Sequence, residues 1–240
     1  MIEMENIQTE SPDSIGFWKT CRDPVLLTVV GGAIDTIGFI ALFGFFTAHV
    51  TGNLVLAGAA WVKGGAGIWI KLAAIPLFIL TVAITKYWID RSALKHTTLS
   101  YLFLGEAIFL TGFMVSGLYF EPFNDASSVT VALTGGLGLI ALAIRNTSSK
   151  TLIKHISPST MMTGNTTQLG IDISNYFRNR NQDNKRKLLH SLSIVIGFVI
   201  GAFLGAFLYV YFDFWSVAFF IIPVLYLSYL ARNNRFVQPD

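Results

Sequence analysis

The chain has 240 residues, of which 53% are hydrophobic and only 13% are charged, and its mean hydropathy is +0.58. Soluble domains carry roughly 25% charged residues, so this composition predicts an integral membrane protein that contacts the lipid bilayer. The net charge of +3 is no footprint for nucleic-acid binding. The single cysteine, Cys21, excludes an internal disulfide, and because no Cys/His cluster has metal-ligand spacing, we expect no metal and no cofactor.

Six stretches are apolar and long enough to cross a membrane, since a spanning helix needs about 20 mostly apolar residues. In chain order they are 24–46, 68–89, 98–120, 129–152, 188–211 and 214–231. Two further segments, 47–63 and 158–177, are shorter and more polar. Residues 1–23 are acidic and polar and lack the basic cluster of a signal peptide. We expect them to form a cytosolic tail.

The two shorter segments contain the same polar phrase, "TAHVTGNLVLAG" at 47–58 and "STMMTGNTTQLG" at 159–170. Each has Thr-Gly-Asn at its centre, as Thr51-Gly52-Asn53 and as Thr163-Gly164-Asn165. Thr and Asn suit helix N-caps, and Gly permits a turn. The pattern therefore predicts two half-helices whose N-terminal ends present unpaired N–H groups inside the membrane. A simpler interpretation, in which each glycine only lets two helices pack closely, stays open.

The basic residues favour segments that enter the membrane and return to the same side. If both Thr-Gly-Asn segments cross fully, Lys and Arg fall on both sides in either orientation. If each segment returns, 15 of the 17 Lys and Arg lie on the side of the N-terminus, and only Lys63 and Lys71 lie on the other. Because cytoplasmic loops carry an excess of basic residues, we predict six crossings, two half-penetrating segments and two cytoplasmic termini.

This topology divides the chain into an inverted repeat. Asp35 lies 18 residues before Asn53, and Asn146 lies 19 residues before Asn165. The predicted repeats are 24–120 and 129–231, joined by an outer loop at 121–128 and followed by a cytosolic C-terminal tail at 232–240. Each repeat has three crossings, so the two halves of this all-α polytopic protein have opposite orientations. In transporters of this kind the site lies at the repeat interface near the midplane.

The stretch "GGAIDTIGFIALFGFFTAHVTGNLVLAG" resembles the opening motif of the YoaK-like family of bacterial membrane proteins, whose domain is of unknown function. The matching positions are Gly31, Gly32, Asp35, Gly38 and Thr51-Gly52-Asn53. In the second half, Asn146 and Thr163-Gly164-Asn165 resemble further motifs of that family, although Arg145 stands where the family pattern has Gln. The resemblance covers the whole chain. It implies the bacterial cytoplasmic (inner) membrane and no particular substrate.

Three ionisable side chains in or near the predicted spans are candidate proton carriers: Asp35, Glu106 and His49. A carboxylate at the centre of a span costs about 2.5–3.5 kcal/mol on insertion scales, so Asp35 should have a partner or a proton. Arg145 either meets Asp35 at the centre or marks the cytoplasmic mouth of its span by snorkelling. A structural hydrogen bond is the alternative for Glu106 and for His49.

Three glycines at four-residue spacing, Gly197, Gly201 and Gly205, predict close helix packing. The motif fits packing within one chain, which we favour, or the face of a homodimer.

We therefore expect a small transporter, coupled or not to protons, for a small polar or anionic solute held between two half-helix ends. The expected substrate-binding residues are Asp35, Thr51, Gly52, Asn53, Arg145, Asn146, Thr163, Gly164 and Asn165. A passive channel and a non-transport scaffold are the alternatives. The sequence has no metal-ligand spacing and no nucleophile motif, so we do not expect an enzyme.

Overall fold

The structure, a computed structural model, describes residues 17–153, 160 and 162–233 and is helical throughout this part. Its eight α-helices and one short 3-10 turn are α1 (Phe17–Ala41), α2 (Val50–Lys63), α3 (Ile68–Arg91), α4 (Lys95–Phe120), α5 (Val129–Thr151), α6 (Met162–Arg178), α7 (Gln182–Phe212), η2 (Asp213–Trp215) and α8 (Ser216–Arg232). The loop between α4 and α5 is the predicted 121–128 connection.

The first predicted span, 24–46, is wrong at its C-terminal end, whereas its start lies close to that of the candidate span Cys21–Ala41. The helix begins at Phe17, inside the expected tail, and ends at Ala41, because the backbone leaves the helical region at the next residues. Phe43 and Gly44 have φ of 51° and 76°, in the left-handed region that terminates helices. The apolar run that continues to residue 46 is therefore a loop that leads into α2, and the two Thr-Gly-Asn segments form the separate helices α2 and α6.

Five stretches of the described chain are long and apolar enough to cross a membrane. Four coincide with α1, α3, α4 and α5, and the fifth, Gln182–Arg232, contains α7, η2 and α8 together. The helices α2 and α6 are not among them, in keeping with their 14 and 17 residues. The chain is therefore a polytopic helical membrane protein.

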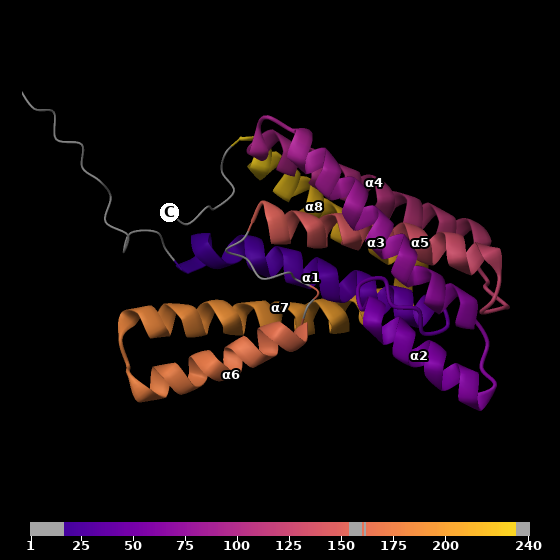
Figure 1. Cartoon of the computed structure of the whole chain (residues 1–240), viewed down its shortest axis with the longest axis horizontal. Coiled ribbons are helices and arrows are strands. Elements are labelled where there is room, and N and C mark those ends of the chain that lie inside the picture. The colour runs from indigo at the N-terminus through magenta and orange to yellow at the C-terminus, as the bar shows by residue number, and fades with distance from the viewer. Residues whose placement is uncertain (1–16, 154–159, 161, 234–240) are drawn as a thin grey trace, which may run out of the picture.

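Figure 1 shows α1 running through the middle of the molecule with α7 beside it. α6 and α7 are antiparallel neighbours and form a hairpin on one side of α1. On the other side α4 packs against α5 and α8, and α3 packs against α5, whereas α2 lies at the lower right of the view and packs against α3. α8 also contacts α1, so the described helices form one connected bundle from which the α6–α7 hairpin projects.

Glycines let α1 and α7 approach at backbone distance. A Cβ built on Gly205 would lie 2.6 Å from the Cα of Ala33, and one on Gly197 would lie 2.5 Å from the Thr28 hydroxyl. The Cβ of a residue at 201 would overlap the Val29 carbonyl. The three predicted packing glycines thus face a helix of their own chain, so this face is not free for a homodimer.

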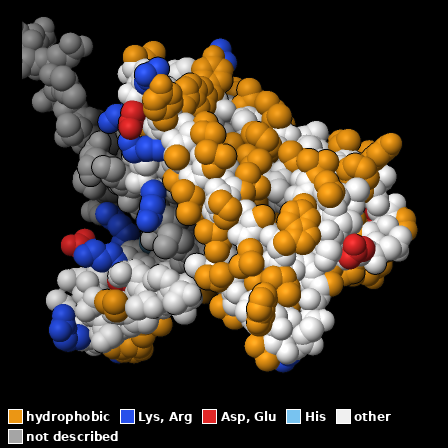
Figure 2. Space-filling view, turned by 45° about the vertical axis from the view of Figure 1, so that its right-hand side comes forward, with side chains coloured by type: hydrophobic (Ala, Val, Ile, Leu, Met, Phe, Trp, Pro, Cys, Tyr) orange, Lys and Arg blue, Asp and Glu red, His pale blue; other side chains and the backbone are white. Residues whose placement is uncertain are grey.

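The outer surface is largely apolar. Trp61, Val62 and Phe203 are 78%, 83% and 75% exposed, and Figure 2 shows hydrophobic side chains over most of the face in view. Most of the Lys and Arg visible there gather along its left-hand edge, beside the α6–α7 hairpin. Soluble monomers rarely expose apolar patches of this extent, whereas lipid-facing helices do.

Candidate functional site

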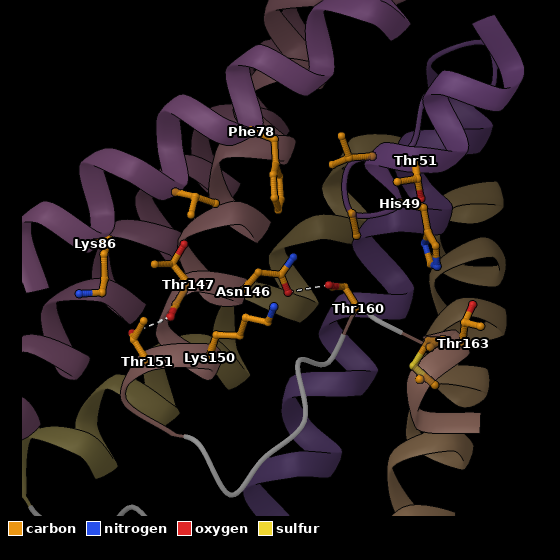
Figure 3. Close-up of a pocket in the computed structure, with 15 residues that line it drawn as sticks. His49, Thr51, Phe78, Lys86, Asn146, Thr147, Lys150, Thr151, Thr160 and Thr163 are labelled. Atoms are coloured by element: carbon orange, nitrogen blue, oxygen red, sulfur yellow. Dashed lines mark hydrogen bonds between the residues drawn. The ribbon is translucent and has the colours of Figure 1, made fainter. Parts of the chain in front are cut away.

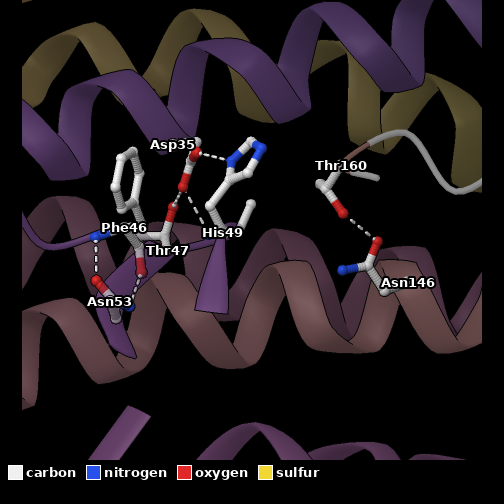
Figure 4. A network of polar contacts seen from close by, with 8 residues as sticks. Asp35, Phe46, Thr47, His49, Asn53, Asn146 and Thr160 are labelled. Atoms are coloured by element: carbon white, nitrogen blue, oxygen red, sulfur yellow. Dashed lines mark hydrogen bonds and ion pairs between the residues drawn. The ribbon is translucent and has the colours of Figure 1, made fainter. Parts of the chain in front are cut away.

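The residues before α2 are held by the carboxylate of Asp35 on α1 (Figure 4). Asp35 is 3% exposed. Its Oδ1 accepts the backbone N–H of Ala48 at 2.6 Å and lies 3.4 Å from the Thr47 hydroxyl, which donates to it. Its Oδ2 lies 2.6 Å from Nδ1 of His49. The acid predicted in the first span therefore has its partners at the entrance of the first half-helix.

Asn53 closes the same loop from the other end. It is fully buried, and its Oδ1 accepts the N–H of Phe46 at 2.9 Å while its Nδ2 donates to the Phe46 carbonyl at 2.7 Å. The amide thus pairs with backbone as a strand would. Because both of its polar atoms are engaged with Phe46, Asn53 faces its own loop and does not present its amide to a solute. Asn165 is itself 5% exposed, and its Nδ2 lies 3.7 Å from the Met162 sulfur.

Asn146 on α5 makes the corresponding contact before α6 (Figure 4). Its Oδ1 accepts the Thr160 hydroxyl at 2.6 Å, and Thr160 is 3% exposed. Ser159, the sequence counterpart of Thr47, lies outside the described residues. A polar side chain on a long helix thus binds the segment that precedes α2 and, separately, the residue Thr160 before α6. The first contact involves an acid and a histidine, and the second involves neutral groups.

A pocket of about 700 Å³ lies between the N-terminal ends of α2 and α6 (Figure 3). The helices α3 and α5 complete it. The described residues that line it are Ala48, His49, Val50, Thr51, Phe78, Val82, Lys86, Asn146, Thr147, Lys150, Thr151, Thr160, Met162, Thr163 and Gly164. Pockets of this size hold small-molecule ligands, and here five threonine hydroxyls and the positive ends of two helix dipoles face the space.

The pocket includes some of the predicted site residues and not others. Thr51, Asn146, Thr163, Gly164 and His49 line it. Absent from the lining are Asp35, Gly52, Asn53, Glu106, Arg145 and Asn165. Asp35 reaches the space only through His49, whereas Gly52 packs on the Phe46 ring, 3.0 Å from where its Cβ would stand.

Arg145 pairs with Glu106 and not with Asp35. The guanidinium and the carboxylate form an ion pair between α5 and α4, with both side chains 0% exposed, and Arg145 also donates to the Leu27 carbonyl of α1 at 2.8 Å. Successive residues of a helix point about 100° apart, so Arg145 faces the core while its neighbour Asn146 faces the pocket. The pairing of Arg145 with Asp35 is therefore wrong, and the burial of its guanidinium contradicts snorkelling.

Two pocket lysines were interpreted from the sequence only as markers of topology. Lys86 lies near the C-terminal end of α3 and pairs with Asp90 one turn on. Lys150 follows Asn146 by four residues on α5, and in the described part of the chain no hydrogen bond or ion pair engages its ammonium. One face of α5 carries Asn146, Thr147, Lys150 and Thr151, because they lie at i, i+1, i+4 and i+5. This spacing is the sequence signal that could have identified Lys150 as a pocket residue. No group of three potential metal ligands occurs among the described residues.

Comparison with known proteins places these features in one family. The family described as "Protein of unknown function (DUF1275)" matches residues 24–230, a range that includes both Thr-Gly-Asn motifs and the whole pocket. The "UPF0700 transmembrane protein YoaK" of Bacillus subtilis (strain 168) is 31% identical over 176 residues, which cover 71% of this chain and 76% of that protein. No solved structure matches the chain.

Proposed function

We propose that this chain, which belongs to the DUF1275 family of membrane proteins of unknown function, is a small secondary transporter of the bacterial inner membrane. The solute is a small polar or anionic molecule that binds in the pocket between α2 and α6. The observation that carries the proposal is the pocket itself, since it lies where two short helices begin, each opening on the same Thr-Gly-Asn phrase. Discontinuous helices of this kind commonly surround transporter sites.

Six crossings agree best with the helices and the charges. The chain between Gln182 and Arg232 holds two helices, α7 and α8, separated by the turn η2, where Asp213 has a positive φ of 46°. Counting them separately gives six spans with α1, α3, α4 and α5. With α2 and α6 returning to their own sides, the basic residues gather on the side of both termini, which we assign to the cytoplasm.

The helix pairing supports an inverted repeat. If α1, α2, α3 and α4 are exchanged with α5, α6, α7 and α8, each main packed pair becomes another packed pair. α1 on α7 becomes α5 on α3, α2 on α3 becomes α6 on α7, α4 on α5 becomes α8 on α1, and α4 on α8 maps onto itself. The contacts of Asp35 and Asn146 with the segments before α2 and α6 follow the same exchange.

The Asp35–His49 pair is the proton site of this proposal. His49 lines the pocket and its Nδ1 lies 2.6 Å from Asp35, so a proton gained or lost by the pair changes the charge beside the solute. An imidazole titrates near neutral pH, which suits a site that exchanges protons with the cytoplasm. Glu106 lies away from the pocket in its pair with Arg145, and we assign it to stability instead.

Flux measurements test this proposal. Purified protein in liposomes, with a pH gradient imposed across the membrane, is offered a panel of small carboxylates, phosphates and neutral amides. A coupled transporter accumulates a solute above its external concentration only while the gradient lasts, and Asp35→Asn should abolish accumulation while the protein stays folded. A passive channel would equilibrate the solute and no more. Absence of protein-dependent flux for every member of the panel would overturn the proposal.

A further inference from the structure

The wall of the pocket has two chemically different parts. One part is polar and comes from α5, with Asn146, Thr147, Lys150 and Thr151, joined by the Thr160 hydroxyl. The other part is apolar and is formed by Phe78 and Val82 of α3 with Val50 and Met162 at the half-helix starts. In Figure 3 the Phe78 ring and the Lys150 chain approach the space from different sides. A ligand that satisfies both parts needs a polar group and a hydrocarbon body.

The charge of the lining is positive. Lys86 and Lys150 contribute ammonium groups, and His49 an imidazole. None of the described residues in the lining is acidic, and Asp35 lies behind His49, where its oxygens are engaged with the loop. Asp90 pairs with Lys86, whereas Lys150 has no such partner among the described residues. Of the two lysines in the described lining, Lys150 is thus the one available to a ligand.

We infer that the solute is a small organic anion whose carboxylate or phosphate group binds Lys150, with its apolar body against Phe78 and Val82. This inference rests on the proposed function and names its substrate class. The hydroxyls of Thr147, Thr151 and Thr160 already donate to the Ala143 carbonyl, the Thr147 carbonyl and the Asn146 Oδ1, respectively. Of these three hydroxyls and the Lys150 ammonium, the ammonium is therefore the donor left for anionic oxygens in the described part of this wall. A space of about 700 Å³ is far larger than an inorganic ion needs, since a water molecule occupies about 30 Å³ in the liquid.

Equilibrium binding to the purified full chain tests the class of solute. The probes are benzoate with its neutral isostere benzamide, phenyl phosphate, and inorganic phosphate, with thermal stabilisation in detergent as the readout. Benzoate or phenyl phosphate should stabilise the protein at concentrations about tenfold or more below those of benzamide and inorganic phosphate, because the neutral probe lacks the charge-assisted hydrogen bond and the inorganic one lacks the apolar contact.

Two substitutions locate the binding. Lys150→Gln should weaken the organic anions about tenfold and leave benzamide unchanged, while Lys63→Gln, at the far end of α2, is the matched control and should change neither. Phe78→Ala should weaken benzoate and leave inorganic phosphate as it was. The melting temperature without ligand shows whether each variant is folded.

The failures of the two proposals can be told apart. Flux of benzamide as fast as that of benzoate, or binding that Lys150→Gln does not alter, would overturn the organic-anion class while transport stands. Two other results would also overturn it. One is stronger stabilisation by inorganic phosphate than by either organic anion, and the other is no stabilisation by either organic anion. Lys150-dependent binding with no flux in liposomes would instead uphold the class and overturn transport.

Discussion

The buried pair of Glu106 and Arg145 predicts a large loss of stability when one member is removed alone. Both side chains are 0% exposed, and the guanidinium also donates to the Leu27 carbonyl at 2.8 Å. Arg145→Met keeps an unbranched, flexible side chain, although a shorter one, and removes the charge, which leaves the Glu106 carboxylate buried without its cation. Removing one partner of a buried ion pair costs about 3–5 kcal/mol. Because Glu106 can take up a proton and become neutral, we expect a loss near 3 kcal/mol, the lower end of that range.

The double variant Glu106→Leu/Arg145→Met separates the pair from the packing. Replacing a buried pair by apolar residues of similar volume is often neutral or stabilising, so the double variant should regain most of what the single variant loses. Unfolding in mixed detergent and SDS micelles, followed by circular dichroism, measures both. If Arg145→Met unfolds at the same SDS fraction as the wild type, the pair does not hold these helices together. The same conclusion follows if the double variant is no more stable than the single one.

Further predictions concern the loop, the helix seam and the topology. Asn53→Ala should lower the free energy of unfolding by about 1–3 kcal/mol, since it leaves the Phe46 amide and carbonyl unpaired. The same unfolding assay measures this loss, and an unchanged midpoint would show that Asn53 does not hold the loop. Gly201→Ala should lower the melting temperature sharply because its Cβ overlaps α1, whereas Gly58→Ala, with nothing within 4 Å, should leave it equal or higher. Single cysteines at Gly64 and Gln182, introduced after Cys21→Ala, should be labelled from opposite sides of the membrane; labelling from one side refutes the inverted topology.

Hydropathy located the long helices because lipid selects apolar residues along the whole length of a span. The same signal failed at residues 42–46, which are as apolar as the span before them. The chain turns there because of the backbone of Phe43 and Gly44 and because Asp35 and Asn53 bind the loop that follows. Those contacts join residues 7 to 14 positions apart in a non-helical arrangement, which periodicity does not detect.

The candidate site was predicted at the level of segments and less well at the level of side chains. The repeated Thr-Gly-Asn motif located the starts of the separate helices α2 and α6, and Thr51, Thr163 and Gly164 do line the pocket. It did not reveal that an asparagine in such a phrase can face its own loop, as Asn53 does. Lys150 was overlooked because a lysine near the end of a span also serves as a topology signal, and only the three-dimensional arrangement brings it to the space between α2 and α6.

The glycine seam between α1 and α7 constrains how such a carrier could move. Helices in contact at backbone distance resist sliding past each other, so we expect α1 and α7 to move together, with α6 packed on α7. In the proposed repeat the counterpart of this group is α5 with α3 and α2, while α4 and α8 pack on each other and contact α5 and α1 in turn. Each of these two groups of helices would then draw on both proposed repeats, and the pocket, lined by α6 on one side and by α2, α3 and α5 on the other, would lie on the boundary between them. Alternating access in this architecture would be a motion of two interleaved bodies, with the 121–128 connection a covalent tether and not the hinge.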